Sequence, residues 1–310
     1  MALALRKNNN RAPVGLDLDG AFIAAVQTNG DGIERAVSME LAPGVIRDGE
    51  VADVSALSDS LKHFFKEHDL PRRVRLGVSN QQIVVRQMDL PKIDDAKERT
   101  AAVRFQAAEA IAMPLDEVIL DHQVIGETMS PEGAARQRIV VVAAREAMIA
   151  RVVEAVRGAG LKAEAIDLDA FALVRALATA SAPDDSARVY CHLAGITNLA
   201  IALGSSCLFT RPLSTSWDDL DEGVANALAE EIRLSIDFYM AQPEARWVGE
   251  VVLSGPGSRR DGLVDELSGL LQLPVQIAEP LGNLDPRGVP MGEDPYRHTV
   301  AAGLAMGADA

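Results

Sequence analysis

Apolar residues near the start of the chain occur in short runs that are separated by glycine turns. The run Val14–Leu18 is followed by Gly20, a second apolar run extends over 21–26, and Asn29-Gly30-Asp31-Gly32 marks another turn. Short apolar runs joined by such turns are typical of β-hairpins. We therefore predict three consecutive strands connected by tight turns.

The same pattern returns 175 residues later in the chain. Residues 189–202 again form an apolar run, a glycine turn and a second apolar run. When the two stretches are aligned, His192 corresponds to Asp17 and Gly195 corresponds to Gly20. Two copies of one supersecondary unit so far apart predict two related domains, each of which opens with a hairpin-rich sheet.

The pattern between the two copies predicts a mixed α/β arrangement. Helical spacing of apolar residues predicts helices over 53–68, 94–112, 146–159 and 171–179, and short apolar runs predict strands at 74–78, 83–90, 117–125, 138–144 and 161–168. The order strand, helix, strand, strand, helix, strand over 83–168 is that of a split βαβ unit. We therefore expect residues 84–161 to form a small domain inserted into the first one.

The second half of the chain continues the α/β pattern. Helices are predicted over 219–240, 261–271 and 298–306, strands at 250–253 and 275–278, and a Pro/Gly-rich loop at 280–295. The chain then divides into a tail (1–13), a first domain (14–83 and 162–186), the insertion (84–161) and a second domain (187–307). We expect helix 298–306 to return towards the first domain.

Length, composition and charge narrow the class of protein. A chain of 310 residues can form two domains with separate cores, and 24% charged residues are ordinary for a soluble globular protein. The net charge of −15 argues against nucleic acid or anionic lipid as a partner of the bulk surface. Residues 1–11 contain no long apolar run, so we expect a flexible tail and not a signal peptide. The uncharged stretch 189–210 contains Gly195 and Asn198, which favour a buried hairpin over a membrane span.

Cys191 and Cys207 both lie in the second hairpin unit. We expect buried, reduced thiols, because free cysteine behaves as a small apolar residue in such a strand. These cysteines and the five histidines show no metal-ligand spacing.

The duplicated turns are also candidates for phosphate chemistry. A glycine at a tight turn lets backbone N–H groups approach an anion closely. An Asp at the end of the preceding strand, here Asp17, can hold a divalent cation, usually through water. Two such turns, at Gly20 and Gly195, can clamp the phosphates of a nucleotide from both sides. Two ordinary hairpins explain the pattern equally well, so the hairpins alone do not decide.

Longer stretches of the chain resemble one family, PilM, the cytoplasmic actin-like proteins of type IV pilus assembly. The similarity extends over residues 14–307 and is most specific in the segments Gly44–Val51, Val84–Lys92, Ala112–Gly126, Ala165–Leu173 and Glu230–Tyr239. FtsA shares the architecture, but the segment Ala112–Gly126 points to PilM.

The resemblance implies an actin-like ATPase fold with two duplicated domains. Residues 14–83 and 162–186 correspond to subdomain 1A, residues 84–161 to the inserted subdomain 1C, and residues 187–307 to subdomains 2A and 2B. It also implies a cytoplasmic scaffold at the inner face of the cell membrane, with only indirect membrane association. Such proteins bind the N-terminal cytoplasmic peptide of PilN, a single-span membrane protein, between 1A and 1C, and link the pilus platform to its motor. An extended peptide in an apolar groove is a known recognition mode.

The resemblance further implies ATP and Mg²⁺ as ligands. The positions that would hold them are Asp17, Gly20, Gly195, Thr197, Glu231, Arg233, Gly255 and Gly257. Asp17 is the candidate for association with Mg²⁺. Glu231 and Arg233 lie on a helix that faces the ribose and base in the superfamily, although a solvated helix face explains them equally well.

Several of these positions depart from the family pattern. Asp19 stands where the first turn glycine belongs, Ala24 replaces a phosphate-binding lysine, His192 replaces an aspartate, and Pro256 interrupts the Gly-Gly-Gly motif for adenosine. An added carboxylate about 4 Å from a phosphate is repelled by about 4 kcal/mol at an effective dielectric constant near 20. His192 at the end of an apolar strand is more typical of a hydrogen-bonded core residue than of a catalytic one.

Three functions are compatible with these residues. The favoured one is a PilM-type scaffold that binds nucleotide weakly, with little or no turnover. The second is an active actin-like ATPase or a sugar kinase of the same fold, which would require intact phosphate loops and a general base. The third is a pseudo-ATPase that binds no nucleotide and acts by protein contacts alone.

Overall fold

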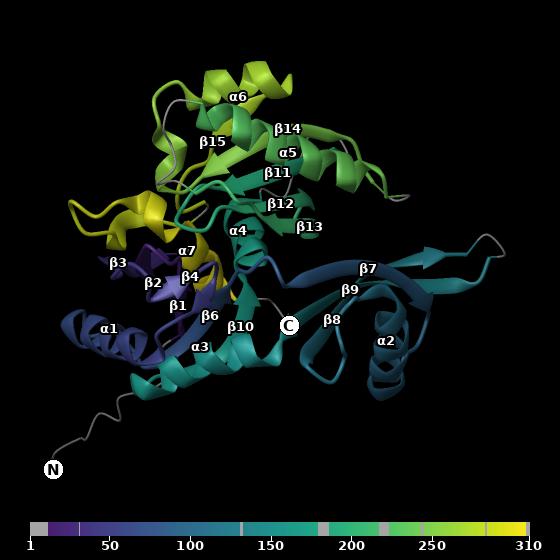
Figure 1. Cartoon of the computed structure of the whole chain (residues 1–310), viewed down its shortest axis with the longest axis horizontal. Coiled ribbons are helices and arrows are strands. Elements are labelled where there is room, and N and C mark those ends of the chain that lie inside the picture. Colours follow the sequence, from purple (N-terminus) through teal and green to yellow (C-terminus); the bar gives the residue numbers. More distant parts are fainter. Residues whose placement is uncertain are drawn as a thin grey trace, which may run out of the picture.

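Two sheets lie on either side of a central pair of helices (Figure 1). The computed structural model describes residues 12–30, 32–130, 133–178, 186–216, 223–242, 245–282 and 284–307. The sequence also predicts a linker between the two domains at 182–186 and a break at Pro243 after the helix 219–240. Most of the expected tail, most of this linker, the start of that helix and Pro243 lie outside the described residues.

The first sheet has the strand order β10-β6-β1-β2-β3. Its strands are β1 (Val14–Leu18), β2 (Phe22–Asn29), β3 (Gly32–Glu40), β6 (Arg73–Val78) and β10 (Lys162–Leu168). The three hairpin strands pair antiparallel, while β6 and β10 continue the sheet in parallel. The predicted run of three hairpin strands is confirmed.

The second sheet repeats this arrangement. Its strands are β11 (Ala187–His192), β12 (Asn198–Leu203), β13 (Ser206–Pro212), β14 (Val248–Ser254) and β15 (Val275–Ile277). Read from β15, the order is β15-β14-β11-β12-β13, with the same parallel and antiparallel pairs as in the first sheet. The duplication predicted from the two hairpin units is therefore confirmed.

Helices cover both faces of each sheet. Helices α1 (Val54–Glu67) and α3 (Glu146–Gly158) share a core with the first sheet, and α5 (Val224–Met240) and α6 (Leu263–Leu271) share one with the second. Helix α1 starts at the predicted place because the Asp53 carboxylate accepts the N–H of Ala56 at 2.9 Å. Between the sheets, α7 (Thr299–Met306) packs on β1 and β2, and α4 (Asp169–Leu177) packs on the second sheet.

The two central helices approach each other closely through Gly303. A Cβ atom at this position would lie 1.9 Å from the carbonyl oxygen of Ala172 on α4. On its other side, α7 meets β1 at Gly15, where a Cβ atom would lie 2.0 Å from the carbonyl oxygen of Ala301. Glycine at these two positions therefore sets the spacing between the layers.

A lobe projects from one side of the first domain (Figure 1). It comprises β7 (Val84–Pro91), α2 (Ala96–Ala110), β8 (Val118–Met129) and β9 (Ala135–Arg145). Its three strands form an antiparallel sheet in the order β7-β9-β8. We call residues 84–145 the lobe.

The prediction of a split βαβ unit is wrong. Strand β10 pairs in parallel with β6 of the first sheet and not with the lobe. Helix α3 packs on α1, and its side chains Val152, Ala155 and Val156 belong to the core of the first sheet. Non-local pairing decides this outcome, because local spacing does not specify which sheet a strand joins. The domain boundaries expected from the sequence stay predictions.

The described part of the chain also contains shorter elements. Strands β4 (Ile46–Arg47) and β5 (Glu50–Val51) form a small hairpin within the segment Gly44–Val51, which carries part of the family resemblance. Short 3₁₀ helices occur at η2 (Pro256–Arg259), η3 (Pro286–Gly288) and η4 (Pro295–His298).

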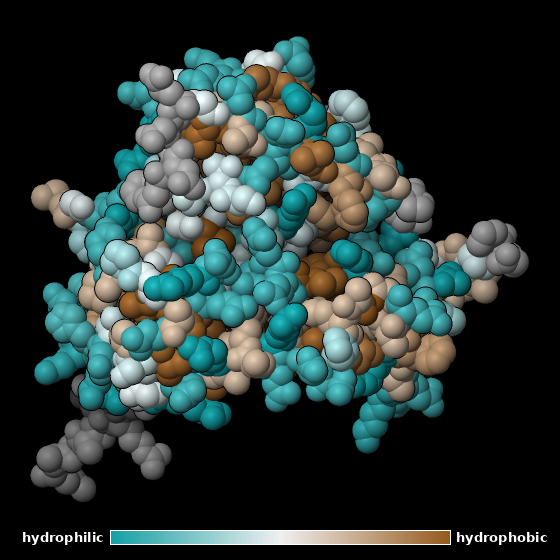
Figure 2. Space-filling view, in the orientation of Figure 1, coloured by the Kyte–Doolittle hydropathy of each residue, from teal (hydrophilic) through white to brown (hydrophobic). Residues whose placement is uncertain are grey.

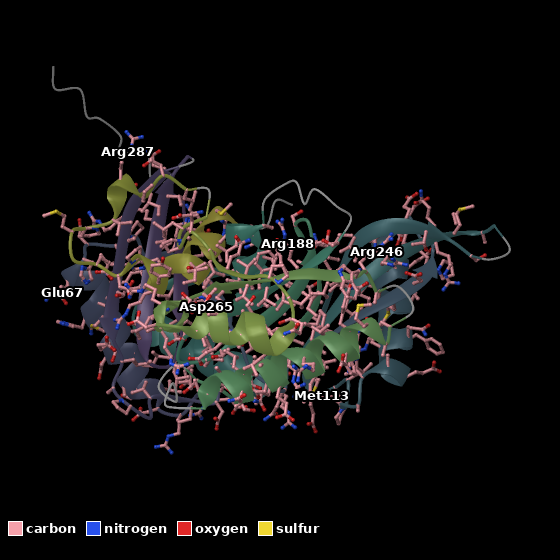
Figure 3. All side chains as sticks on the ribbon, turned by 90° about the horizontal axis from the view of Figure 1, so that it is seen from above. Glu67, Met113, Arg188, Arg246, Asp265 and Arg287 are labelled. Carbon is pink, nitrogen blue, oxygen red and sulfur yellow. The ribbon has the colours of Figure 1, made fainter. Side chains whose placement is uncertain are left out.

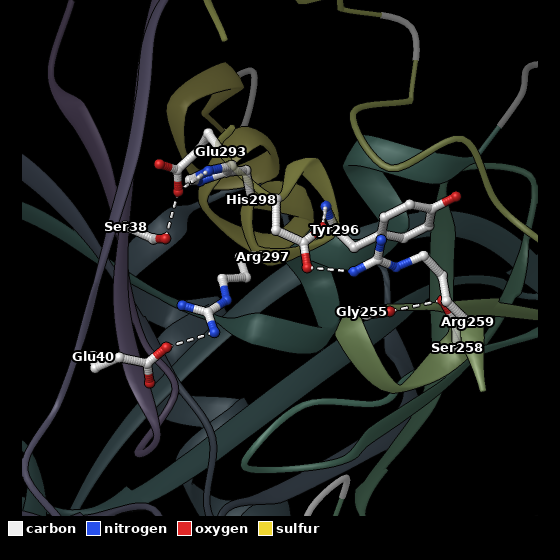
Figure 4. Close-up of polar contacts among 10 residues, drawn as sticks. Ser38, Glu40, Gly255, Ser258, Arg259, Glu293, Tyr296, Arg297 and His298 are labelled. Carbon is white, nitrogen blue, oxygen red and sulfur yellow. Dashed lines mark hydrogen bonds and ion pairs between the residues drawn. The ribbon is translucent and has the colours of Figure 1, made fainter. Parts of the chain in front are cut away.

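The Pro/Gly-rich segment before α7 ties the two domains together (Figure 4). Arg297 pairs with Glu40 of β3 at 2.6 Å, whereas Asp294 pairs with Arg259 of η2 at 2.6 Å. Glu293 accepts the hydroxyl of Ser38 and lies 3.1 Å from Nε2 of the buried His298. The predicted loop is thus a strap with partners in both domains.

Polar and apolar side chains are mixed over most of the surface in Figure 2, and hydrophobic side chains gather where the lobe joins the rest of the molecule. Long charged side chains such as those of Glu67 and Arg287 lie at the periphery (Figure 3). None of the helices in the described ranges has the length and apolarity that a membrane crossing requires.

Both cysteines are free. Cys191 is buried as expected, whereas Cys207 is only partly buried, so the expectation of two buried thiols is wrong for Cys207. Burial raises the pKa of the Cys191 thiol to about 12, and we expect this thiol to react slowly with thiol reagents. Because the thiolate is the reactive form, its fraction at pH 8 is small. In alkylation followed by peptide mass spectrometry, Cys191 should be labelled only as fast as the protein unfolds. Rapid labelling of Cys191 in the native protein would contradict this expectation.

Candidate functional site

The two duplicated turns meet at the junction of the two domains. Gly20, between β1 and β2, has a φ of +101°, a conformation that favours glycine. A Cβ atom on Gly20 would lie 3.9 Å from Ile196, and one on Gly195 would lie 3.0 Å from the Cβ of Ala21. The structure therefore places the predicted residues Gly20 and Gly195 in two turns that approach each other across the junction.

Asp17 and Asp169 are buried carboxyl groups near this junction. Asp17 is 2% exposed in β1, and Asp169 is 5% exposed at the start of α4. Burial, together with the charges of Asp169 and Asp19, raises the pKa of Asp17 well above its usual range. Burial and the charges of Asp19 and Asp167 raise the pKa of Asp169 to about 8. Oδ1 of Asp169 is among the buried polar atoms of the described residues that have no hydrogen-bond partner.

Sequence reasoning did not select Asp169 as a site residue. The signal that was available is its position directly after a buried strand, in the segment Ala165–Leu173 that carries part of the family resemblance. The carboxyl ends of parallel strands are where ligands bind in open α/β sheets. Asp169 at the end of β10 occupies such a position.

His192 lies at the end of β11 and is buried. Its Nδ1 is 2.9 Å from the hydroxyl oxygen of Ser254. Burial lowers the pKa of His192 to about 4, so the imidazole is neutral at pH 7. Its Nε2 has no hydrogen-bond partner in the described part of the chain.

Thr197 and Asn198 follow the second turn and are both buried. Oγ1 of Thr197 is another buried atom with no partner among the described residues. Oδ1 of Asn198 accepts the hydroxyl of Ser79, which follows β6 of the first sheet. This buried bond joins the two domains beside the turns.

Gly255 and Gly257 use their backbone within the second domain. Gly255 has a φ of +83°, and a Cβ atom there would lie 2.5 Å from the carbonyl oxygen of Leu193. The same oxygen accepts the N–H of Gly257 at 3.0 Å. The carbonyl oxygen of Gly255 accepts the hydroxyl of Ser258 at 2.7 Å (Figure 4).

Glu231 and Arg233 form hydrogen bonds with residues outside the Gly20 and Gly195 turns. The carboxylate of Glu231 accepts the N–H groups of Ser214 and Thr215 at 2.9 and 3.1 Å. These hydrogen bonds outweigh burial and hold the pKa of Glu231 below its usual value. Arg233 is exposed on α5 and donates to the carbonyl oxygen of Leu270 at 2.6 Å. A role of either residue in nucleotide binding stays a prediction.

Three backbone donors of these turns already have hydrogen-bond partners within the chain. The N–H groups of Gly195 and Ile196 are bonded to Asp19 at 2.9 and 3.1 Å, and that of Gly257 is bonded within its own turn. Ala24, at the position of the expected lysine, is fully buried. Within the described ranges, no three His, Cys, Asp or Glu side chains converge closely enough to hold a metal ion. A role of these turns in binding ATP and Mg²⁺ stays a prediction.

Two grooves beside β8 form a second candidate site. Groove A, of about 640 Å³, lies between α3 and β8 and is lined by Ile119, Glu146, Ile149, Ala150, Val153, Glu154, Arg157 and Gly158. Groove B, of about 320 Å³, lies between β8, β9, α4 and the β12–β13 turn and is lined by Gln123, Val124, Ile125, Val140, Phe171, Arg175, Ser205, Ser206, Cys207 and Gly307. Sequence reasoning assigned none of these side chains.

Strand β8 is an edge of the lobe sheet. It pairs with β9 along one side only. Ile119 is 45% exposed and Val124 is 37% exposed, which are large fractions for apolar side chains in a strand. The carboxylate of Asp121 accepts the N–H of His122 at 2.8 Å and so covers one backbone donor. An edge with exposed apolar side chains is a surface on which an extended chain can pair.

Comparison with known proteins places the chain among pilus proteins. A family model described as type IV pilus assembly protein PilM matches residues 15–214. The fold is similar to that of a solved PilM–PilN type IV pilus biogenesis complex, with a TM-score of 0.80 and 25% identity over 95% of this chain and 98% of that chain.

Two further solved structures share the fold at lower identity. The ethanolamine utilization protein EutJ from Carboxydothermus hydrogenoformans has a TM-score of 0.54 and 15% identity, over 95% of this chain and 89% of that one. MreB5 of Spiroplasma citri bound to AMPPNP has a TM-score of 0.50 and 13% identity, over 96% of each chain.

Proposed function

Because the chain belongs to the PilM family of type IV pilus assembly proteins, we propose that it is a scaffold that binds an extended segment of a PilN-like membrane protein. Its fold is that of the actin-like ATPases. On this proposal, the chain acts through protein contacts at the inner face of the cell membrane, and its domain junction does not turn over nucleotide.

The observation that carries the proposal is the free edge of β8 with one groove near its start and another near its middle. Ile119 lines groove A and Ile125 lines groove B, six residues further along the same strand. At about 3.3 Å per residue, these positions are about 20 Å apart. A partner segment of about seven extended residues therefore reaches both grooves while it runs beside β8.

The chemistry of the two grooves differs. Groove A offers apolar side chains of α3 and β8, bordered by Glu146, Glu154 and Arg157, and so suits an apolar side chain next to a basic one. Groove B contains Phe171 and Arg175. The guanidinium of Arg175 is held in place by Asp167 at 2.7 Å and by the carbonyl oxygen of Gly303 at 2.8 Å. Side chains that project alternately from an extended segment can be selected by such pockets.

The hydrogen bonds at the domain junction support a scaffold that does not hydrolyse nucleotide. Nucleotide hydrolysis in this fold needs a phosphate-binding cradle and a positioned base or water. Here the turn amides of Gly195 and Ile196 are bonded to Asp19, and His192 is buried and neutral. A scaffold gains specificity from fixed grooves and needs no chemical step.

The proposal is tested by titrating the full chain with a synthetic peptide of the N-terminal cytoplasmic residues of the PilN-like protein. Ala150→Arg places a long charged side chain in groove A at an exposed helix position. We expect this variant to bind the peptide at least tenfold more weakly, which corresponds to about 1.4 kcal/mol. Isothermal titration calorimetry measures the change.

A matched control exists on the other helix of this region. Ala108→Arg adds the same side chain at an exposed position of α2, away from both grooves, and should change the affinity less than twofold. Equal weakening by both substitutions would show that groove A is not the binding site. Titration with ATP and Mg²⁺ in the same series tests the junction, and rapid hydrolysis without peptide binding would favour the enzyme alternative.

A further inference from the structure

Asp19 belongs to the first turn, and its carboxylate accepts hydrogen bonds from the second. Its Oδ1 accepts the N–H of Gly195 at 2.9 Å, and its Oδ2 accepts the N–H of Ile196 at 3.1 Å. The N–H of Ala21, in its own turn, lies 3.4 Å from Oδ1. Asp19 is only 5% exposed. One buried carboxylate therefore accepts hydrogen bonds from both turns.

The second turn has the properties of an anion site. Successive backbone N–H groups that point into one concavity bind oxyanions. A side chain on Gly195 would place its Cβ 2.5 Å from Oδ1 of Asp19, so only glycine permits this approach. Carboxylate and phosphate oxygens are equivalent acceptors for such N–H groups, and hydrogen bonds to either are charge-assisted.

The two turns also approach each other closely. A Cβ atom on Gly195 would lie 3.0 Å from the Cβ of Ala21, and one on Gly20 would lie 3.9 Å from a side-chain carbon of Ile196. The bond from Ser79 to Asn198 closes the same junction. The chain's own groups thus make the interdomain contacts that a bound phosphate would make between two facing turns.

We propose that Asp19 is a built-in anion that takes the place of a nucleotide phosphate at the Gly195–Ile196 turn and holds the two domains closed without nucleotide. This inference rests on the proposed function, because it explains why a scaffold of this fold needs no ligand to stay closed. Groove B is walled by the lobe, by α4 of the first domain and by the β12–β13 turn of the second. Constant closure therefore keeps that groove at a constant width.

The test is hydrogen exchange of the Gly195 and Ile196 amides in the full chain, resolved by NMR. In the unsubstituted chain these amides should exchange slowly, at the same rate with and without ATP and Mg²⁺. Asp19→Ala should speed their exchange at least tenfold. Asp265→Ala, which removes an exposed carboxylate on α6 (labelled in Figure 3), should leave it unchanged. Unchanged exchange in Asp19→Ala, or protection of these amides by ATP in the unsubstituted chain, would overturn the inference.

Chemical rescue separates the charge of Asp19 from its packing. Formate is small enough to enter the space left in Asp19→Ala and should restore slow exchange, whereas chloride at the same ionic strength should not. Equal exchange rates in the two salts would show that Asp19 acts through packing alone and would overturn the assignment. If Asp19→Ala does not fold, Asp19→Asn keeps the size of the side chain and removes one acceptor. It should then speed exchange at Gly195 or Ile196, and no change at either amide would overturn the inference.

Peptide binding, measured on the same samples, distinguishes the two proposals. Peptide binding with exchange that does not respond to Asp19 would overturn only the built-in anion. Exchange that responds as expected in a chain that binds no peptide would overturn the proposed function and leave the anion in place.

Discussion

Replacing Gly303 by alanine is expected to lower the free energy of unfolding by about 3 kcal/mol, at the upper end of typical overpacking effects. The new Cβ would lie 1.9 Å from the carbonyl oxygen of Ala172 and 2.6 Å from its carbon, both of which belong to the backbone of α4. Because a backbone cannot move aside like the end of a flexible side chain, α4 and α7 would have to separate. Urea denaturation followed by circular dichroism measures the loss.

The control is the same substitution at Gly269 in α6. A Cβ atom there meets no other atom within 4 Å. Because alanine is a better helix former than glycine, Gly269→Ala should raise the free energy of unfolding by about 0.5–1 kcal/mol. A Gly303→Ala variant as stable as the unsubstituted chain would show that the spacing of α4 and α7 is not fixed by that glycine.

Replacing Asp169 by asparagine is expected to stabilise the protein, and to do so more at pH 8 than at pH 5. Burial, with the charges of Asp19 and Asp167, raises the pKa of Asp169 from an ordinary value of 3.8 to about 8. The folded chain therefore keeps this proton up to about pH 8, while the unfolded chain releases it near pH 4. Stability from this proton is complete below pH 4 and is lost as the pH rises to 8, by at most about 1.4 kcal/mol per pH unit.

Asparagine removes this loss because its amide is uncharged at every pH in that window. Denaturation of both proteins at pH 5, 6, 7 and 8 should show a smaller fall of the free energy of unfolding in Asp169→Asn. Asp265→Asn, at an exposed position of α6, is the control for removing a carboxylate. A constant difference between Asp169→Asn and the unsubstituted chain from pH 5 to pH 8 would contradict the assignment of the proton to Asp169.

Local patterns predicted most elements because glycine turns and short apolar runs act over a few residues. The hairpin strands around Gly20 and Gly195 and helix α1 with its Asp53 cap are of this kind. The similarity of the two domains was also predicted, because the second hairpin unit repeats the local sequence pattern of the first. The resemblance to PilM, which the family model confirms, came from longer segments such as Ala112–Gly126.

What the sequence did not predict depends on contacts between distant residues. The strand β10 carries no local signal for its parallel partner β6, and the segment before α7 carries none for its bonds to Glu40 and Ser38. Asp19 is the clearest case in the candidate site. Its charge was interpreted through the repulsion it would exert on a phosphate, whereas the structure gives it hydrogen bonds to amides 176 and 177 positions away.

The free edge of β8 has a consequence for the supply of the protein in the cell. An edge strand of twelve residues is a template for pairing with any extended chain, including a second copy of this one. Asp121 protects only one of its backbone donors. If the proposed membrane partner pairs with this edge, copies made in excess of it carry an unsatisfied strand edge, and we expect them to aggregate more readily. We therefore expect that producing this chain and its proposed membrane partner in equal amounts keeps the chain soluble, in addition to supporting assembly.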